Sequence, residues 1–294
     1  MKVRAFAEND VADVAALLAQ LRGVGRPVEP LDAPQLRELL ARPLHAGGRD
    51  FRVATHEGAF VAVAFTTRYT LAERARPIRE LRLFVAHDPL REAAARSLLE
   101  AVLALDTEPV FRRAQDPAGE SATLFASNGF NEVQRILVLR RRGIPQTVSA
   151  LPPEVRLRDA DLSEDTPALV SLVDVAHRDG FGFGPIDASE LEALLRPPGA
   201  RLLVAEHRKR AIGFVSTLPT RDGRGVLHLL QVSPEIRGQG LGRALAESAI
   251  HALAQQGFGE VEVHVDAANT VARTLYGRLG FSTHREDLVH ERMP

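Results

Sequence analysis

Apolar and polar positions divide the second half of the chain into an ordered series of strands and helices. Runs with a period of two predict strands at residues 154–158, 202–207, 211–218, 226–232, 260–265 and 288–292. Runs with apolar positions three and four residues apart predict helices at residues 166–177, 188–195, 241–255 and 270–279. The order β-α-α-β-β-β-α-β-α-β predicts an α/β (α+β) fold, with a mixed, mostly antiparallel sheet flanked by helices.

The chain carries this pattern twice. Residues 110–130 align without a gap with residues 261–281, at an offset of 151. Near the start, residues 3–21 resemble residues 155–173 in the same order. This offset is too long for a solenoid repeat, so the sequence predicts two tandem copies of one domain. We expect a first domain at 1–143, a proline-containing linker at 144–153 and a second domain at 154–294.

Composition narrows the classes of partner and chemistry. Of 294 residues, 45% are hydrophobic and 26% are charged, as in a packed globular protein. The formal net charge of −1 provides no overall positive field, so we expect no nucleic-acid or membrane partner. The chain has no cysteine, which excludes disulfides, thiolate metal sites and a thiol-linked acyl intermediate. Charges interrupt the first ten residues, so we expect no signal peptide and a cytoplasmic location. The histidines show no metal-ligand spacing, so we expect no metal.

A glycine-rich segment follows the strand predicted at residues 226–232. It reads Arg237-Gly238-Gln239-Gly240-Leu241-Gly242-Arg243 and leads into the next predicted helix. Glycine lets a backbone approach a ligand closely, and the free amides at the start of a helix bind anions. The spacing matches neither the dinucleotide-binding Gly-x-Gly-x-x-Gly pattern nor a nucleotide-binding loop that ends in lysine. The segment therefore predicts a diphosphate site, and the alternative is a simple turn between a strand and a helix.

Two motifs in this half resemble a known family. They are Val-Ser-Pro-Glu-Ile-Arg-Gly-Gln-Gly-Leu-Gly-Arg at 232–243 and Asn-Thr-Val-Ala-Arg-Thr-Leu-Tyr-Gly-Arg-Leu-Gly-Phe at 269–281. Together they are similar to the fingerprint of the GNAT family of N-acetyltransferases. The tandem arrangement resembles the two-domain, mycothiol synthase-like members of that family. The resemblance implies an enzyme that transfers an acetyl group from acetyl-CoA, its cosubstrate, to a primary amine.

The resemblance also assigns roles to individual residues. It implies that backbone amides of the segment Arg237, Gly238, Gln239, Gly240, Leu241, Gly242 and Arg243 hold the pyrophosphate. Leu230, Gln231 and Val232 would pair with the pantetheine amides, and Asn269 would contact the cofactor arm. Tyr276 would be the general acid that protonates the departing CoA thiolate. The alternatives are that Tyr276 only packs on the sheet and that Asn269 only caps its helix.

The general base is less clearly marked. Some members of the family have a glutamate six residues before the valine of the Val-x-Pro segment, and Val226 stands at that position here. His228 lies two residues further along the same predicted strand and has a side chain suited to proton uptake near neutral pH. We take His228 as the candidate base. A packed or solvated histidine is the alternative, with a chain of water molecules accepting the proton.

The first half lacks the corresponding chemical groups. Arg91 and Arg96 bracket the equivalent segment, but Glu92-Ala93-Ala94-Ala95 replaces the glycines. Phe125 stands at the tyrosine position, and Ala118 stands at the position of Asn269. We therefore expect a first domain that keeps the fold and has lost the transferase chemistry.

The acceptor is not specified by the sequence. In the resembling family the loop between the first two helices holds the acceptor, which here implies Arg178, Phe181 and Phe183 as substrate-binding residues. A plain surface loop is the alternative. We expect direct attack by a small-molecule amine or a protein N-terminus, in a monomer or homodimer. The alternative function is a noncatalytic acyl-CoA-binding regulatory module.

Overall fold

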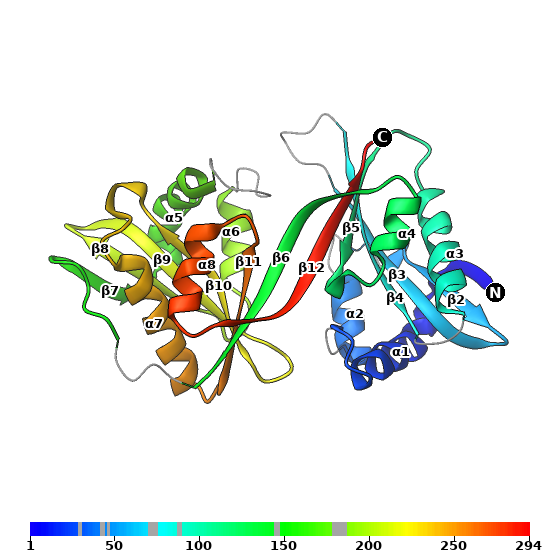
Figure 1. Cartoon of the computed structure of the whole chain (residues 1–294), viewed down its shortest axis with the longest axis horizontal. Coiled ribbons are helices and arrows are strands. Elements are labelled where there is room, and N and C mark those ends of the chain that lie inside the picture. The colour runs from blue at the N-terminus through cyan, green and yellow to red at the C-terminus, as the bar shows by residue number, and fades with distance from the viewer. Residues whose placement is uncertain are drawn as a thin grey trace. The chain divides into compact units, whose positions relative to one another are not determined.

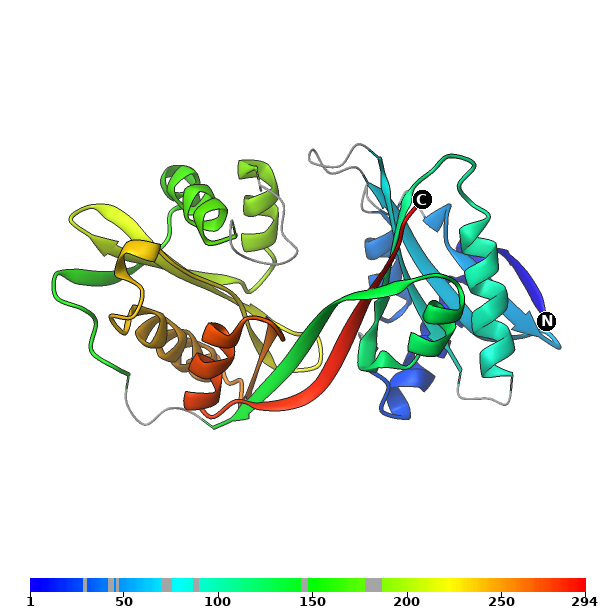
Figure 2. The same ribbon diagram turned by 45° about the horizontal axis from the view of Figure 1, so that its top comes forward.

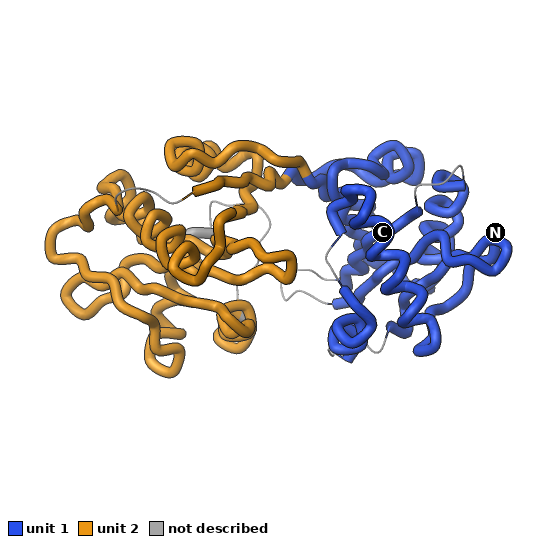
Figure 3. The backbone as a smooth tube through the Cα atoms, turned by 90° about the horizontal axis from the view of Figure 1, so that it is seen from below, with its two compact units in different colours: residues 1–135, 287–294 blue, residues 136–286 orange. Residues whose placement is uncertain are grey.

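The computed structural model describes residues 1–28, 31–41, 45, 48–69, 76–86, 90–143, 148–177 and 187–294. The chain forms two compact units, coloured in Figure 3: unit 1 contains residues 1–135 and 287–294, and unit 2 contains residues 136–286. None of the described helices is long and apolar enough to cross a membrane.

Unit 1 is a mixed sheet covered by helices on both faces (Figure 1). Its own elements are β1 (Lys2–Ala5), α1 (Val11–Gly23), α2 (Ala33–Ala41), β2 (Arg52–His56), β3 (Ala59–Tyr69), β4 (Ile78–Val85), α3 (Arg91–Leu103), β5 (Phe111–Asp116) and α4 (Ala122–Ser127). Neighbouring strands from β1 to β5 pair antiparallel, except that β4 and β5 are parallel. Helices α1 and α2 share one apolar core with the sheet, while α3 and α4 share another.

Unit 2 repeats this arrangement (Figure 2). Its elements are β7 (Val155–Asp159), α5 (Leu162–His177), α6 (Ala188–Leu195), β8 (Arg201–His207), β9 (Arg210–Pro219), β10 (Gly225–Val232), α7 (Leu241–Gln255), β11 (Glu260–Asp266) and α8 (Thr270–Arg278). Strands β7 to β10 pair antiparallel in sequence order, and β10 pairs parallel with β11. The predicted mixed, mostly antiparallel sheet with flanking helices is confirmed in both halves.

Two strands, β6 (Asn131–Arg142) and β12 (Ser282–Arg292), contribute to both units. In unit 2, residues 136–142 of β6 pair antiparallel with β11. In unit 1, residues 288–292 of β12 pair antiparallel with β5. The prediction that residues 288–292 belong to the sheet of the second half is therefore wrong. Apolar alternation shows which face of a strand is buried, but it does not show which of two related sheets the strand joins.

The sheet of unit 2 has two different faces. The core under α7 and α8 contains Val261, Val263 and Val265 of β11. The core under α5 and α6 contains Phe214 of β9, with Leu229 of β10 packed against it. Because side chains alternate along a strand, the residues of β11 between the three valines lie on the face opposite α7 and α8.

Most predicted boundaries in the second half agree with the structure to within one residue, and α6 and α7 agree at both ends. Helix α5 is an exception, because it begins at Leu162 rather than at the predicted Thr166. The Asp161 carboxylate accepts a hydrogen bond from the Ser163 amide at 2.9 Å. This carboxylate caps the first turn and moves the start of the helix four residues ahead of Thr166.

Candidate active site

Strands β10 and β11 lie side by side for only part of their length. Parallel pairing joins residues 225–227 to residues 261–263. β10 continues to Val232 and keeps its pairing with β9 on the other side. A register shift between Leu227 and Leu229 makes His228 an extra residue in β10, which is a β-bulge. Within the described chain, the stretch from Leu229 to Val232 therefore has no partner from β11, and its free edge suits an extended ligand.

The glycine-rich segment lies directly beyond this free edge. Gly238 and Gly240 have φ angles of 77° and 87°, in the left-handed region that favours glycine. Gly240 is the N-cap residue of α7 and offers no side-chain cap. A Cβ atom at either glycine would find no heavy atom of the described chain within 4 Å. The space beside both glycines is thus open within the described chain, and no side chain caps the first amides of α7, which is the arrangement of an anion site at a helix start.

The two arginines beside this segment differ in their contacts. Arg237 donates from Nε to the Val232 carbonyl at 3.3 Å. Arg243 donates from Nε to Glu247 Oε1 at 2.8 Å. The buried Glu247 also accepts from the Ser149 amide at 2.6 Å. Arg243 is therefore held along α7, while Arg237 follows the end of β10.

Tyr276 lies on α8 with its ring in the core under α7 and α8. The ring meets Phe281 edge to face, with 5.5 Å between centroids. Burial raises the pKa of the Tyr276 hydroxyl, so this group stays protonated at neutral pH. The structure thus shows the packing role of Tyr276 and a protonation state that suits a proton donor.

Asn269 is the N-cap residue of α8. Its Oδ1 accepts a hydrogen bond from the Ala272 amide at 3.0 Å. The helix-capping alternative is therefore observed, and the expected contact with the cofactor arm stays a prediction. The amide nitrogen of Asn269 and the second lone pair of its Oδ1 could both serve such a contact.

His228 sits at the bulge between the paired and unpaired parts of β10. Its Nδ1 is buried and has no hydrogen-bond partner in the described chain. Burial, and secondly the charge of His264, lowers the pKa of His228. The neutral imidazole is therefore favoured at this position. The other predicted substrate residues, Arg178, Phe181 and Phe183, lie outside the described residues.

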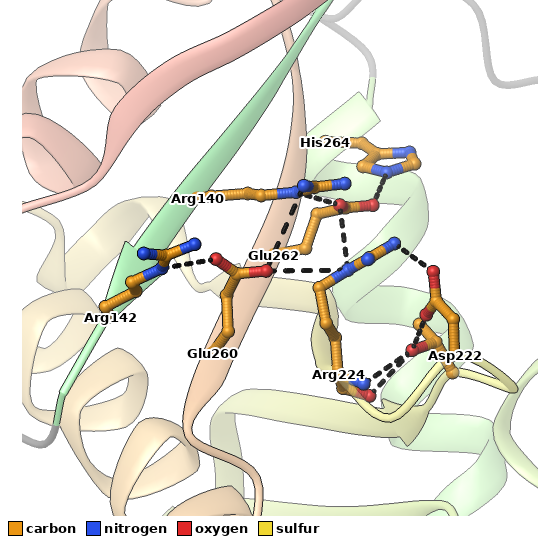
Figure 4. Close-up of polar contacts among 8 residues, drawn as sticks. Arg140, Arg142, Asp222, Arg224, Glu260, Glu262 and His264 are labelled. Carbon is orange, nitrogen blue, oxygen red and sulfur yellow. Dashed lines mark hydrogen bonds and ion pairs between the residues drawn. The ribbon is translucent and has the colours of Figure 1, made fainter. Parts of the chain in front are cut away.

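A polar cluster on β11 was not foreseen (Figure 4). The Glu262 side chain is buried. Its carboxylate accepts a hydrogen bond from Arg140 Nε at 2.8 Å, and it lies 2.8 Å from Nε2 of His264. Arg224 Nε lies 3.4 Å from the same carboxylate. Burial alone would raise the pKa of Glu262, but the hydrogen bonds from His264 and Arg140 outweigh it and lower this pKa to about 2. Arg140 comes from β6 of the first half, and no motif in the sequence indicates that contact.

A hollow of about 390 Å³ lies elsewhere in unit 2. It is bordered by α8 residues such as Arg273 and Thr274 and by Leu137 and Leu139 of β6. None of the residues predicted to bind the cofactor or the acceptor borders it. Within the described residues, no group of histidine, aspartate and glutamate side chains is arranged to hold a metal ion.

Comparisons with known proteins agree with the motifs. Residues 167–281 match the acetyltransferase (GNAT) family. A protein of Thermobispora bispora named mycothiol acetyltransferase is 30% identical over 66% of this chain and 70% of its own length. A mycothiol acetyltransferase of Geodermatophilus obscurus is 29% identical over 99% of this chain and 97% of its own length.

The fold agrees as well. A tandem GNAT protein from the clavulanic acid biosynthesis pathway has a structure that covers 99% of this chain and 98% of its own, with a TM-score of 0.75 and 16% identity. That match concerns the tandem fold alone. The sequence relatives, the matched family segment and the motifs at 232–243 and 269–281 all lead to one assignment: the chain belongs to the acetyltransferase (GNAT) family and is an acetyl-CoA-dependent N-acetyltransferase.

Proposed function

We propose that acetyl-CoA binds in unit 2, with its pantetheine arm against the free edge of β10 and its pyrophosphate at the start of α7. The observation that carries this proposal is the end of β10–β11 pairing at Leu227, directly before the glycine-rich segment. Leu230, Gln231 and Val232 would pair with the pantetheine amides as an added strand would. The amides from Arg237 to Arg243 would surround the pyrophosphate, and the dipole of α7 favours its charge.

The transfer proceeds by direct attack of the amine on the thioester carbonyl. The carbon–nitrogen bond forms, the carbon–sulfur bond breaks, and the electron pair leaves with sulfur. Tyr276 donates its hydroxyl proton to the thiolate, and its raised pKa keeps that proton available. No cysteine exists to carry the acetyl group. From the sequence, His228 is the candidate base that takes the proton of the acceptor ammonium group. Burial lowers the pKa of His228, so its imidazole is neutral before the reaction.

The acceptor we propose is the amine precursor of mycothiol, meaning mycothiol without its acetyl group. The relatives that match nearly the whole chain are named mycothiol acetyltransferases, which supports this class of small amine. Arg178, Phe181 and Phe183 are proposed to contact it from the loop after α5. Val226 stands at the position where the resemblance places a glutamate base in some members of the family.

We further propose that the first half, residues 1–143, is a GNAT-like domain without a cofactor site, and that residues 154–294 carry the working site. Arg91, at the start of α3, is bound by Glu120 at 3.0 Å, and Arg26 pairs with the same carboxylate. An internal carboxylate thus occupies the cations that an incoming pyrophosphate would need. Phe125, at the tyrosine position, is fully buried and offers no proton.

The test is acetyl transfer to a panel of amines. The purified full chain is incubated with acetyl-CoA and the mycothiol precursor, a protein N-terminal peptide, a polyamine or an amino sugar. Mass spectrometry then follows the acetylated product. We expect the highest kcat/KM with the mycothiol precursor. Preference for another amine would contradict the acceptor proposal, and tight CoA binding without turnover of any amine would contradict catalysis in unit 2.

A further inference from the structure

We propose that His264, oriented by Glu262, is the base that removes the proton from the acceptor ammonium group. The inference rests on the proposed function, because it assigns a residue to the reaction in unit 2. It replaces His228 as the proton acceptor and gives the polar cluster on β11 a role in the reaction. Three observations carry it: the place of His264 on β11, the contact with Glu262, and the access of its ring.

The place of His264 follows from the strand register. Leu227 and Val263 form the last parallel pair between β10 and β11. His264 is therefore the first residue of β11 beyond the point where the strands stop pairing. It lies on the face opposite α7 and α8, because Val263 and Val265 point into the core under those helices. Tyr276 belongs to that core. The proposed base and acid therefore lie on opposite faces of the sheet, beside the opening where β10 and β11 stop pairing.

The contact with Glu262 determines which nitrogen of His264 accepts a proton. Nε2 lies 2.8 Å from Glu262 Oε1. With a pKa lowered to about 2, the Glu262 carboxylate is ionised at neutral pH and can only accept a hydrogen bond. The hydrogen of a neutral His264 must therefore be on Nε2, which leaves the lone pair on Nδ1. A carboxylate that orients a histidine in this way also stabilises the imidazolium that forms.

Glu262 is itself held in position by two arginines. Arg140 on β6 donates to it at 2.8 Å, and Arg224, the residue just before β10, lies 3.4 Å away. Glu262 also pairs in register with Val226 of β10. Glu262 thus supplies a carboxylate from β11, the strand beside β10, and acts through His264 as a positioning residue.

His228 is less suited to the same task. Its ring is half-buried, its buried Nδ1 has no partner within the described chain, and burial lowers its pKa. Taking up a proton there would place an uncompensated charge in the interior. The side chain of His264 is 49% exposed and has an anionic partner. An acceptor molecule can therefore reach His264, and the charge that forms is balanced.

Other charged groups surround this pair. Glu262 lies on the same strand as His264. The others are Arg140 on β6, Arg224 just before β10, His228 on β10 and His284 on β12. Glu260 lies further along β11 and is paired with Arg142 at 3.0 Å. Of these groups, Glu262 is the one in direct contact with His264, at 2.8 Å.

The proposed step balances as follows. The acceptor enters as R–NH₃⁺ and gives one proton to Nδ1 of His264. The resulting amine attacks the thioester, the carbon–sulfur bond breaks, and the thiolate takes the proton of Tyr276. The nitrogen then loses a second proton, which restores the Tyr276 hydroxyl through solvent, and His264 releases its proton to water. The products are the acetamide, CoA–SH and one proton.

The experiment compares the full-length chain with its His264→Ala and His264→Gln variants. Turnover of the mycothiol precursor, or of the best amine in the panel, is measured against pH, together with acetyl-CoA affinity. We expect kcat to fall by ~10²–10⁴-fold, the contribution of a general base, with acetyl-CoA affinity unchanged. The decline of kcat/KM toward acidic pH should disappear in both variants. Added imidazole should restore part of the activity of His264→Ala.

His207→Ala is the matched control. His207 also pairs with a glutamate, Glu154, at 3.2 Å, but it lies on β8 away from the opening between β10 and β11. Its removal should leave the pH profile unchanged. Wild-type kcat and pH dependence in His264→Ala would overturn the inference. It would also be overturned if the decline of kcat/KM toward acidic pH were lost in His228→Gln alone. Absence of turnover in the wild-type protein would instead contradict the proposed function, and the inference with it.

Glu262→Gln tests the positioning role. Loss of the negative partner makes the imidazolium less favourable, so the acidic limb of the pH profile should move to lower pH while kcat falls. A purely structural role would lower activity equally at all pH values. Unchanged acetyl-CoA affinity shows that this variant is folded, and Glu262→Asp should restore part of the lost kcat because it keeps the charge.

Discussion

The residues at positions 125 and 276 show how little separates the two halves at their proposed catalytic position. Phe125 and Tyr276 are both buried on the first helix after a sheet strand. The ring of Phe125 lies 5.3 Å from Phe130, and that of Tyr276 lies 5.5 Å from Phe281. The same sequence offset relates both pairs. The packing is therefore common to the two halves, and the hydroxyl is the difference.

Tyr276→Phe should lower kcat far more than it lowers acetyl-CoA affinity. The ring and its packing remain, and only the proton donor is lost. A donor that acts as the thiolate forms contributes to the transition state, typically by ~10²–10⁴-fold, and we expect the low end because CoA thiolate is already a tolerable leaving group. Steady-state kinetics and CoA titration check this.

The control for this prediction is Tyr69→Phe, which removes the hydroxyl of the other tyrosine in the chain. Tyr69 lies on β3 in unit 1 and hydrogen-bonds Glu80 at 3.2 Å. Its removal should leave kcat unchanged. A wild-type rate for Tyr276→Phe would show that the hydroxyl is not the acid, although the family assignment would stand.

At the scale of elements, the segment from the end of β10 to the start of α7 gathers the features expected of a cofactor site. A strand that loses its neighbour, a turn with two left-handed glycines and an uncapped helix follow one another in fewer than twenty residues. Each is unfavourable or neutral for stability on its own. Together they expose backbone donors in one place, which is the arrangement an anionic, extended ligand requires.

Gly240→Val should weaken acetyl-CoA binding strongly while the protein stays folded. Valine disfavours a φ of 87°, and its side chain would enter the open space before the first amides of α7. Gly257→Val is the matched control, because Gly257 ends the same helix with a φ of 92° and the same open surroundings. Calorimetric titration measures both. Equal CoA affinity in the two folded variants would mean that the segment is only a connector.

At the scale of the whole chain, the exchange of strands is the main organising feature. β6 brings Arg140 to Glu262 of unit 2, and β12 brings His290 to within 5.2 Å of the Phe125 ring in unit 1. Each half of the sequence thus supplies a strand to the sheet of the other. Neither half contains all the backbone partners that its central strands use.

One molecule of CoA should bind per chain. Unit 2 offers the open glycine-rich segment, whereas in unit 1 Glu120 is paired with Arg91 at the start of α3 and with Arg26 after α1. Calorimetric titration of the full chain with CoA should give a stoichiometry near one. Two equivalent sites would contradict the loss of the cofactor site from the first half.

Residues 144–294 expressed alone should be less stable and bind CoA weakly. This fragment lacks residues 136–142 of β6, so β11 loses its antiparallel partner and Glu262 loses Arg140. A peptide of residues 131–143 should restore binding. Removal of residues 1–5, an edge strand of unit 1, is the control and should leave CoA affinity unchanged. Full affinity in the isolated fragment would contradict a structural need for the exchange.

The sequence by itself determined the elements, the internal repeat and the family. Helices α6 and α7 were predictable at both ends because apolar spacing and terminal glycines are local signals. The left-handed turn before α7 was predictable because its glycines are consecutive local signals, and its proposed role as an anion site uses backbone amides of the same residues. The contrast between Tyr276 and Phe125 was visible because the two positions align at the offset of the internal repeat.

Only the tertiary structure decided how strands pair across the repeat and which side chains meet on β11. The contact between Arg140 and Glu262 joins residues 122 positions apart, and it depends on β6 entering the sheet of the second half. The bulge at His228 likewise depends on the register between β9 and β10. The two halves carry related strand patterns, so hydrophobic patterning alone does not show which half the last strand joins. The sheet that each strand joins is set by contacts between residues far apart in the sequence, which only the folded chain brings together.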